Sequence, residues 1–232
     1  MSLPPGRPKE GSLSTRHEGA RPGPGGKARS AKGAHGRRIG LFGGTFDPPQ
    51  LAHTALARGA RDALPLDEVR WIPTGQPWQK SHAISDARYR EAMVKLAIAG
   101  ERGFVLERCE LERAGPSYSL QTVHELQRRE PGASWFLLVG ADQYNNLHTW
   151  RGWQELLGLV TLAVAERPGV VMQPDGQVAR LPHRAVPLPP MDISATDIRG
   201  RVARGDSILG LVTPSVAGYI AQHHLYRSAA GH

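Results

Sequence analysis

Cysteine is nearly absent from this sequence, and no stretch is long and apolar enough to cross a membrane. Cys109 is the single cysteine in 232 residues, which excludes an internal disulfide and a zinc site built from several cysteines. The longest mostly apolar run, residues 156–165, covers half of the roughly 20 residues that a spanning helix needs. Residues 1–38 lack the apolar core of a secretory signal. We therefore expect a cytoplasmic protein without a membrane partner, in a compartment where thiols stay reduced.

Acidic residues are outnumbered, at 21 against 29 lysines and arginines, and the formal net charge is +8. Residues 1–38 hold nine basic and two acidic residues, so 20 basic and 19 acidic residues remain for the rest of the chain. The near-neutral remainder argues against binding of nucleic acid by the folded domain. The basic tail contains no aromatic residue, which favours a tail without a role over a nucleic-acid-binding arm.

The first 36 residues differ in composition from the rest. They contain eight glycines and five prolines, with few large apolar side chains. Such a segment cannot bury enough apolar surface to offset the entropy of ordering it. We predict a disordered basic extension over residues 1–36 and one domain over residues 37–228, a length that suits a single α/β domain.

Apolar patterning after residue 38 alternates between strands and helices. Short continuous apolar runs predict buried strands at residues 39–42, 69–72, 104–106, 135–139 and 159–165, and helical spacing predicts helices at residues 52–64, 87–99, 120–129, 150–157, 195–204 and 214–223. Buried strands that alternate with helices indicate an α/β fold with a Rossmann-like, doubly wound parallel sheet and C-terminal helices. Ligands bind beyond the carboxyl ends of such strands. We therefore expect a crevice formed by residues 43–53, 73–82, 140–150 and 166–169.

The first polar motif follows the first predicted strand and reads Gly-Gly-Thr-Phe-Asp-Pro-Pro-Gln-Leu-Ala-His, residues 43–53. It matches neither the GxGxxG fingerprint nor the P-loop. Gly43 and Gly44 still let the backbone approach an anion, and the next helix directs its positive end there. His53, near the first turn of that helix, is placed to reach a phosphate. A glycine turn with a half-buried histidine explains the motif equally well.

This motif resembles Gly-Gly-Thr-Phe-Asp-Pro-x-His-x-Gly-His, the signature of bacterial nicotinate-nucleotide adenylyltransferases, which are members of the nucleotidylyltransferase superfamily. The chain matches at residues 43–48 and at His53. It departs at Gln50, where the family has its first histidine, and at Ala52, where the family has glycine. The resemblance extends from about residue 38 to residue 227, with the motifs in the family's order.

A second motif, Ile-Ser-Ala-Thr-Asp-Ile-Arg at residues 193–199, resembles the family's Ile-Ser-x-Thr-x-Ile-Arg. Ser194 with Asp197 three residues later is a capping-box pattern, which explains Ser194 without a ligand. It does not explain Arg199, whose planar fork suits phosphate oxygens. The resemblance implies that this motif holds the β- and γ-phosphates of ATP.

Weaker matches complete the predicted site. Asp142 suits ribose hydroxyls, although capping of a short helix explains it nearly as well. Trp150 is similar to the family's tryptophan that stacks on the pyridine ring, whereas Trp153 is expected in the core. The Ser117–Tyr118–Ser119 segment resembles one whose backbone N–H groups receive the nicotinate carboxylate, and Ser119 is also a plausible N-cap. Lys80 and Arg167 match the family in place.

The resemblance implies adenylyl transfer from ATP to nicotinate mononucleotide, giving nicotinate adenine dinucleotide and pyrophosphate, as in NAD biosynthesis. The resemblance implies three sets of site residues. The catalytic residues are His53, Lys80 and Arg199; the ATP-binding residues are Gly43, Gly44, Thr45, Phe46, Gln50, His53, Asp142, Arg167, Ile193, Ser194, Thr196 and Arg199; the mononucleotide-binding residues are Thr45, Lys80, Ser117, Tyr118, Ser119 and Trp150. Mg²⁺ is expected to arrive with ATP, held mostly by water and substrate oxygens and by no metal ligands of the protein's own.

Three alternatives remain open at this point. One is a related nucleotidylyltransferase acting on nicotinamide mononucleotide, phosphopantetheine or another phosphate acceptor. A second is a nucleotide-binding sensor that has lost turnover, suggested by Gln50. The third is a nucleic-acid-binding protein driven by the basic tail. The oligomeric state is not predictable from the sequence.

Overall fold

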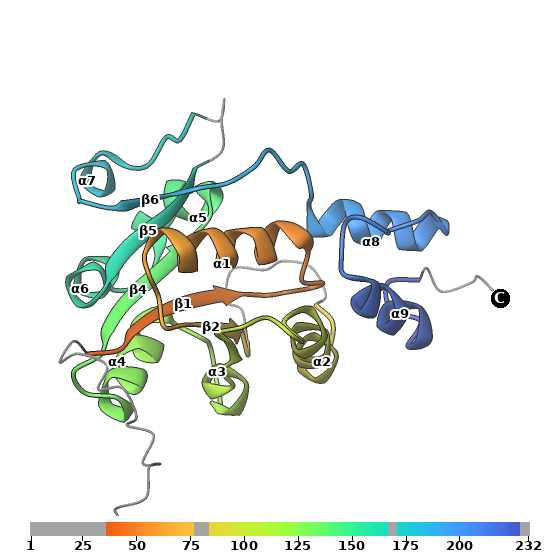
Figure 1. Ribbon diagram of the computed structural model, residues 1–232, viewed down its shortest axis with the longest axis horizontal. Helices are drawn as coiled ribbons and strands as arrows, with labels where there is room; N and C mark the ends of the chain where they lie inside the picture. The colour runs from red at the N-terminus through yellow and green to blue at the C-terminus, as the bar shows by residue number, and fades with distance from the viewer. Residues whose placement is uncertain (1–35, 77–83, 167–170, 228–232) are drawn as a thin grey trace, which may run out of the picture. The chain divides into compact units, whose positions relative to one another are not determined.

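The computed structural model describes residues 36–76, 84–166 and 171–227. The predicted extension over residues 1–36 therefore lies outside the described residues except for Gly36, and the domain boundaries remain predictions. Within the described part, the chain alternates strands and helices around one sheet, as the apolar pattern predicts (Figure 1). None of the helices described there is long and apolar enough to cross a membrane.

Six parallel strands form the sheet in the order β3-β2-β1-β4-β5-β6. The strands are β1 (Arg38–Gly44), β2 (Glu68–Pro73), β3 (Phe104–Leu106), β4 (Ser134–Val139), β5 (Thr161–Glu166) and β6 (Arg184–Pro187). The order reverses between β1 and β4, which start the two halves of the sheet. This arrangement confirms the predicted Rossmann-like fold, and its crevice lies at the reversal point.

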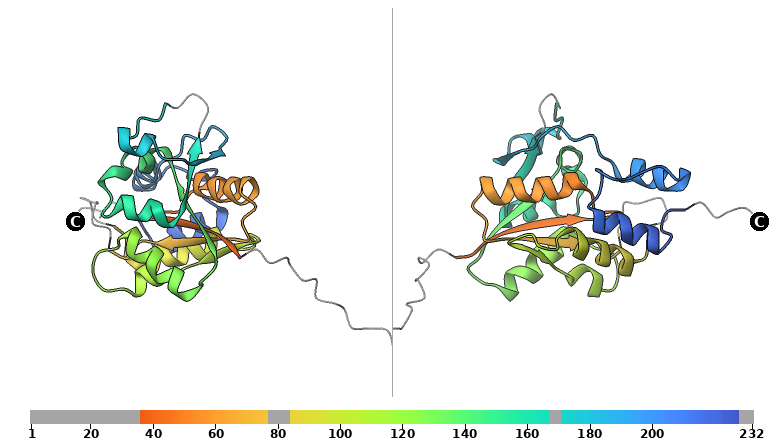
Figure 2. Two further views of the ribbon diagram at one scale, coloured as in Figure 1. Left: turned by 90° about the vertical axis from the view of Figure 1, so that its left-hand side faces the viewer. Right: turned by 45° about the vertical axis from the view of Figure 1, so that its right-hand side comes forward.

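The helices are α1 (Leu51–Ala63), α2 (Ala87–Ala97), α3 (Cys109–Glu112), α4 (Ser119–Arg129), α5 (Ala141–Asn145), α6 (Trp153–Leu159), α7 (Gly176–Ala179), α8 (Ala195–Arg204) and α9 (Pro214–Gln222), with a 3₁₀ turn at Leu147–Thr149. They lie on both sides of the sheet (Figure 2). Alternate residues of β1 serve the two faces: Phe42 packs with α1, whereas Ile39 and Leu41 pack with α4 and α6. A third apolar cluster joins α2, α8 and α9, which lie toward the end to which β1 points (Figure 1).

Several local expectations were wrong. The helix predicted from residue 150 begins at Trp153, because Gly152 takes a left-handed conformation (φ 68°) and Trp150 is extended. Strand β6 was missed, since only Val186 of its four residues is buried and the apolar pattern is too weak to see. The short helices α3 and α7 were also missed, because their four residues are too few to show a period. A short helix beside Asp142 was considered, and it is α5.

Candidate active site

A cavity of about 550 Å³ opens at the carboxyl ends of β1 and β4. Its wall contains every predicted site residue that the structure describes: Gly43, Gly44, Thr45, Phe46, Gln50, His53, Ser117, Tyr118, Ser119, Asp142, Trp150, Ile193, Ser194, Thr196 and Arg199. Lys80 and Arg167 lie outside the described residues. Segments as far apart in the chain as the β1–α1 loop and α8 therefore share one hollow, as the parallel sheet requires.

The β1–α1 turn presents its backbone to this cavity. A Cβ atom built on Gly43 would meet nothing within 4 Å, so this position leaves open space in the wall. A Cβ atom on Gly44 would instead come within 2.9 Å of the Phe46 ring. Phe46 is buried and has a positive φ of 51°. Gly43 is thus where a ligand can approach the backbone, while Gly44 is required by the packing of the turn itself.

His53 is the third residue of α1, and its ring is held from two sides. Its Nδ1 accepts a hydrogen bond from the backbone N–H of Gln50 at 3.1 Å. The rings of Phe42 and Phe46 contact the imidazole edge to face, at centroid distances of 5.8 and 5.2 Å. Burial against these rings lowers the pKa of His53 to about 4. The neutral ring therefore carries its proton on Nε2, where it can donate to a phosphate oxygen.

Gln50 occupies the N-cap position of α1 and forms a capping box with His53, in which the Gln50 side chain faces the backbone N–H of His53, although its buried Oε1 does not meet full hydrogen-bond geometry among the described residues. The first helical N–H, that of Leu51, donates to the carbonyl oxygen of Leu211 at 2.9 Å. One of the free N–H groups at the start of α1 is therefore hydrogen-bonded by the segment before α9.

Helix α8 brings the second predicted anion site to the same cavity. Ser194 caps the helix, with its Oγ accepting from the N–H of Asp197 at 3.1 Å, which confirms the capping interpretation. Asp197 pairs with Arg201 rather than returning to the cap. Arg199 donates to the backbone oxygen of Asp47 at 2.8 Å and to Thr196 Oγ1 at 3.3 Å. These bonds hold the guanidinium against the β1–α1 turn, so both motifs face one volume.

Arg90 is a buried cation that ties together the loops around the cavity. Only 2% of its surface is exposed, and it donates to four carbonyl oxygens: Ser85 at 2.9 Å, Thr45 at 3.1 Å, Thr74 at 2.7 Å and Gly75 at 3.2 Å. Burial lowers the pKa of Arg90, against the attraction of Asp47. One side chain of α2 thereby fixes the turn after β1 relative to the loop after β2.

At the other end of the cavity, the loop after β2 packs against the segment before α4. A Cβ atom on Gly75 would lie 2.0 Å from the backbone oxygen of Glu110, so only glycine fits. The N–H of Gly75 donates to Ser117 Oγ at 3.1 Å, and the N–H of Ser117 donates to the oxygen of Gln76 at 3.1 Å. Both polar groups of Ser117 are therefore engaged by this loop. The expected role of its N–H toward a carboxylate stays a prediction.

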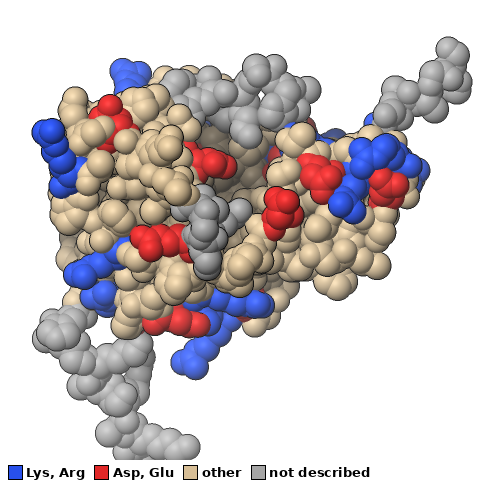
Figure 3. Space-filling model, turned by 90° about the horizontal axis from the view of Figure 1, so that it is seen from above, with Lys and Arg blue, Asp and Glu red and all other residues tan. Residues whose placement is uncertain are grey.

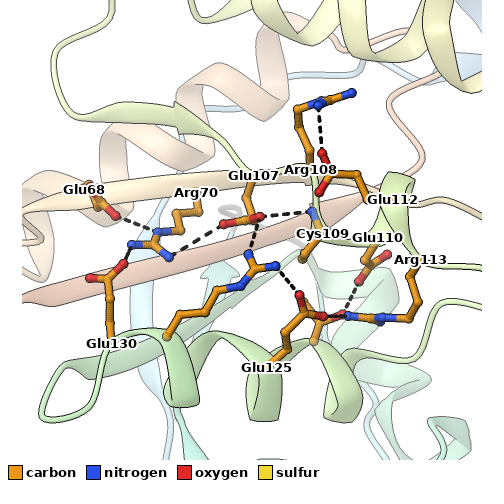
Figure 4. Close-up of polar contacts among 12 residues, drawn as sticks. Glu68, Arg70, Glu107, Arg108, Cys109, Glu110, Glu112, Arg113, Glu125 and Glu130 are labelled. Atoms are coloured by element: carbon orange, nitrogen blue, oxygen red, sulfur yellow. Dashed lines mark hydrogen bonds and ion pairs between the residues drawn. The ribbon is translucent and has the colours of Figure 1, made fainter.

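Glu110 lies behind this loop with 6% of its surface exposed, and it reaches the cavity wall. Thr122 donates to its carboxylate at 2.8 Å, and Ser117 also bonds it. Burial raises the pKa of Glu110. Through Thr122, which also accepts from Arg113, Glu110 adjoins a row of ion pairs (Figure 4). The row contains Arg113, Glu125, Arg129, Glu107, Arg70, Glu68 and Glu130. This network braces the wall from outside.

Aromatic side chains line the same end of the cavity. Trp150 is half-buried there, whereas Trp153 belongs to the core, as predicted. Tyr118, the N-cap residue of α4, lies under the guanidinium of Arg151, whose Cζ is 4.9 Å from the ring centroid. Ser119 is the first residue of α4 rather than its N-cap, so the capping interpretation of Ser119 was wrong.

Asp142 occupies the second position of α5, at the carboxyl end of β4. Gly140 is the N-cap of that helix, which removes the capping explanation for Asp142. The carboxylate is exposed and lines the cavity, which is compatible with ribose hydroxyls. Within the described ranges, no three His, Cys, Asp or Glu side chains gather as metal ligands. Asp47 is committed elsewhere, because it accepts from Tyr226 and from the N–H of Ser85.

Comparisons with known proteins agree with this geometry. A family model described as cytidylyltransferase-like matches residues 41–201. A probable nicotinate-nucleotide adenylyltransferase of Methylibium petroleiphilum is 50% identical over 201 residues, which are 84% of this chain and 95% of the relative. The chain belongs to the nicotinate-nucleotide adenylyltransferases. A relative with the same description from Bordetella petrii is 47% identical over 197 residues, 82% of this chain and all of the relative.

Solved structures of adenylyltransferases share the fold at low identity. The Plasmodium falciparum nicotinic acid mononucleotide adenylyltransferase complexed with NaAD matches with a TM-score of 0.69 at 17% identity, and its complex with APC with 0.65 at 18%. Each match covers 82% of this chain and 97% of the solved one. These likenesses show the same fold, and the nucleotidyltransferase assignment rests on the closer sequence relatives.

Sequence reasoning missed three residues around the site of this adenylyltransferase. Arg151 follows Trp150 directly, and no motif marked it. Glu110 lies eight or fewer residues from Ser117 and Tyr118, yet an isolated glutamate carries no signal of burial. Asp47 was recognised only as part of the motif. Its bond to Tyr226 spans 179 positions, and nothing local predicts a pairing over that distance.

Proposed function

We propose that this chain transfers the adenylyl group of ATP to nicotinate mononucleotide, releasing pyrophosphate. The observation that carries the proposal is the shared cavity, which is lined by Arg199 and the turn at Gly43 as well as by Trp150 and Tyr118. The guanidinium and the turn suit a triphosphate, and the aromatic side chains suit a planar ring. The cytoplasm, where ATP is abundant, remains the expected location.

The reaction needs positioning and charge stabilisation more than an activated nucleophile. A phosphate oxygen of the mononucleotide attacks the α-phosphorus of ATP, and the bond from that phosphorus to the oxygen of the β-phosphate breaks. Because the nucleophile is already an anion, no general base is required. His53 would donate from Nε2 to the α-phosphate, and Arg199 with Ser194 and Thr196 would hold the leaving pyrophosphate. Lys80 is expected to assist.

The charge of the phosphates calls for a divalent cation. Mg²⁺ binds mainly to phosphate oxygens and water, and it would supply neutralisation of the charge that develops on pyrophosphate. Among the described residues, the exposed carboxylate of Asp142 lines the cavity, where it is open to a hydrated cation. We therefore expect the substrates, rather than side chains, to hold it.

Nucleic acid is not an expected partner of the described domain. On the face shown in Figure 3, acidic and basic side chains are interspersed, and no stripe of one sign crosses it. Many arginines are also paired with carboxylates, as Arg70 is with Glu68 and Glu130. A phosphate backbone binds best to a continuous basic surface.

The test is pyrophosphate release from ATP and Mg²⁺ with nicotinate mononucleotide, run beside nicotinamide mononucleotide. We expect fast release with the acid and slow release with the amide. Omission of Mg²⁺ should abolish release if the cation is required. Comparable release with the amide would contradict the acid specificity. Release with neither substrate, while ATP still binds, would favour the sensor that has lost turnover.

A further inference from the structure

Arg151 extends from a backbone segment that the structure fixes on both sides. The N–H of Trp150 donates to the oxygen of Leu147 at 3.0 Å, and the N–H of Trp153 donates to the oxygen of Trp150 at 3.2 Å. Between them, Gly152 has a φ of 68°, and a Cβ atom there would lie 2.6 Å from Cδ2 of Leu120. The segment is thus pressed against α4, which places the Arg151 backbone firmly at the cavity rim.

The Arg151 side chain is aimed by an aromatic ring. Its Cζ lies 4.9 Å from the centroid of the Tyr118 ring, and both residues line the cavity. A guanidinium over an aromatic face is attracted by the ring quadrupole and is held with its donors at the edge of the stack. Trp150, the residue before Arg151, lines the same cavity, so a planar group bound beside these residues meets two aromatic side chains and one cation.

The charge of Arg151 is not neutralised by a carboxylate in the described part of the chain, where its guanidinium forms no ion pair. Glu110, on the same wall, is occupied by Thr122 and Ser117. The other cavity-lining guanidinium that the structure describes, Arg199, donates to the backbone oxygen of Asp47 and to Thr196 Oγ1, so its donors are already held against the β1–α1 turn. Among the residues that the structure describes, Arg151 therefore presents a cation without a paired carboxylate in the cavity wall, beside the Tyr118 ring.

We infer that Arg151 is a specificity-determining residue, which selects an aromatic mononucleotide whose ring bears a carboxylate over one whose ring bears an amide. The inference rests on the proposed function. It assigns recognition of the ring carboxylate's negative charge to the side chain of Arg151. A guanidinium gains a charge-assisted hydrogen bond from a carboxylate and a weaker one from a neutral amide. We expect loss of this charge to lower the acid-to-amide preference about tenfold.

The experiment measures binding as well as turnover. Affinities for nicotinate mononucleotide and nicotinamide mononucleotide are determined by calorimetry with a non-hydrolysable ATP analogue, for wild type, Arg151→Gln and Arg151→Lys. Arg180→Gln is the matched control, because Arg180 is an exposed arginine that lines no cavity described above. Arg151→Gln should lose acid affinity about tenfold with amide affinity unchanged, Arg151→Lys should lose less, and the control should match wild type.

The outcomes separate this inference from the proposed function. An unchanged acid-to-amide ratio in Arg151→Gln overturns the inference, and so does a parallel loss of both affinities, which would indicate a structural role. Wild-type protein that binds the acid without releasing pyrophosphate contradicts the proposed function, yet its binding ratio still decides the role of Arg151. Wild-type protein that binds neither mononucleotide overturns both.

Discussion

The hydroxyl of Tyr226 donates a hydrogen bond to Oδ1 of Asp47 at 2.6 Å, across 179 positions of sequence. The same carboxylate accepts from the N–H of Ser85 at 3.1 Å, and the backbone oxygen of Asp47 accepts from Arg199. Burial and the adjacent carboxylate raise the pKa of Tyr226, which keeps its hydroxyl a donor. The segment after α9 thereby supports the turn that faces the expected phosphates.

Replacement Tyr226→Phe tests this support. It leaves one oxygen of a buried carboxylate without its donor, so we expect a loss of about 1–3 kcal/mol in the free energy of unfolding. The KM for ATP should rise more than the KM for nicotinate mononucleotide, because the Asp47 turn lies at the phosphate end. Urea denaturation and initial rates measure both. Tyr219→Phe on α9 is the control, and an equal effect there would refute the specific role of Tyr226.

The two glycines of the turn should respond differently to alanine. Gly43→Ala places a methyl group in open cavity space, so stability should change by no more than about 0.5 kcal/mol while ATP binding weakens. Gly44→Ala drives a methyl group into the Phe46 ring, which should cost roughly 1–3 kcal/mol of stability. Thermal unfolding of both variants measures the change in stability, and ATP titration measures the change in ATP affinity. Unimpaired ATP binding by Gly43→Ala would contradict close approach of a ligand at this point.

The lowered pKa of His53 makes stability depend on pH. In the unfolded chain the imidazole titrates near its ordinary 6.5, whereas in the folded protein its pKa is about 4. Between these pH values the unfolded state therefore binds the proton more readily than the folded state. The stability that the neutral His53 side chain contributes is fully present above pH 6.5 and is lost as the pH falls toward 4. The linked loss is at most about 3 kcal/mol. Urea unfolding at several pH values should show a flatter profile in His53→Gln, and identical profiles would exclude a buried neutral imidazole.

Gln50 stands where the family has a histidine, and its side chain forms a capping box with His53 at the start of α1. An amide donates a neutral hydrogen bond to phosphate, about half as strong as that of a histidinium. We expect Gln50→His to increase kcat about fivefold, equivalent to roughly 1 kcal/mol. Gln121→His, at an exposed position of α4, is the control. A kcat that is unchanged or lower in Gln50→His would mean that Gln50 is not a weakened phosphate contact.

Much of the fold and the site follows from local sequence. The apolar runs around Leu41, Trp71 and Leu137 are buried strands, because continuous apolar residues need cover on both faces of a sheet. The order of strands and helices then requires the motifs at residues 43–53 and 193–199 to meet beyond the strand ends. All described residues predicted for the site do line one cavity. Periodicity and topology explain why these segments meet, whereas the individual residues were identified by their resemblance to the family's motifs.

Tertiary structure decided what depends on contacts between distant segments. The partners of Asp47, the four carbonyl oxygens around Arg90 and the ring beneath Arg151 come from segments that no local pattern connects. Burial of Glu110 likewise arises only when α4 and the loop after β2 pack over it. The sequence by itself determined which elements form and where their polar ends gather. The packed fold alone determined which side chains are paired, and within the described part of the chain it left Arg151 without a carboxylate partner beside the Tyr118 ring.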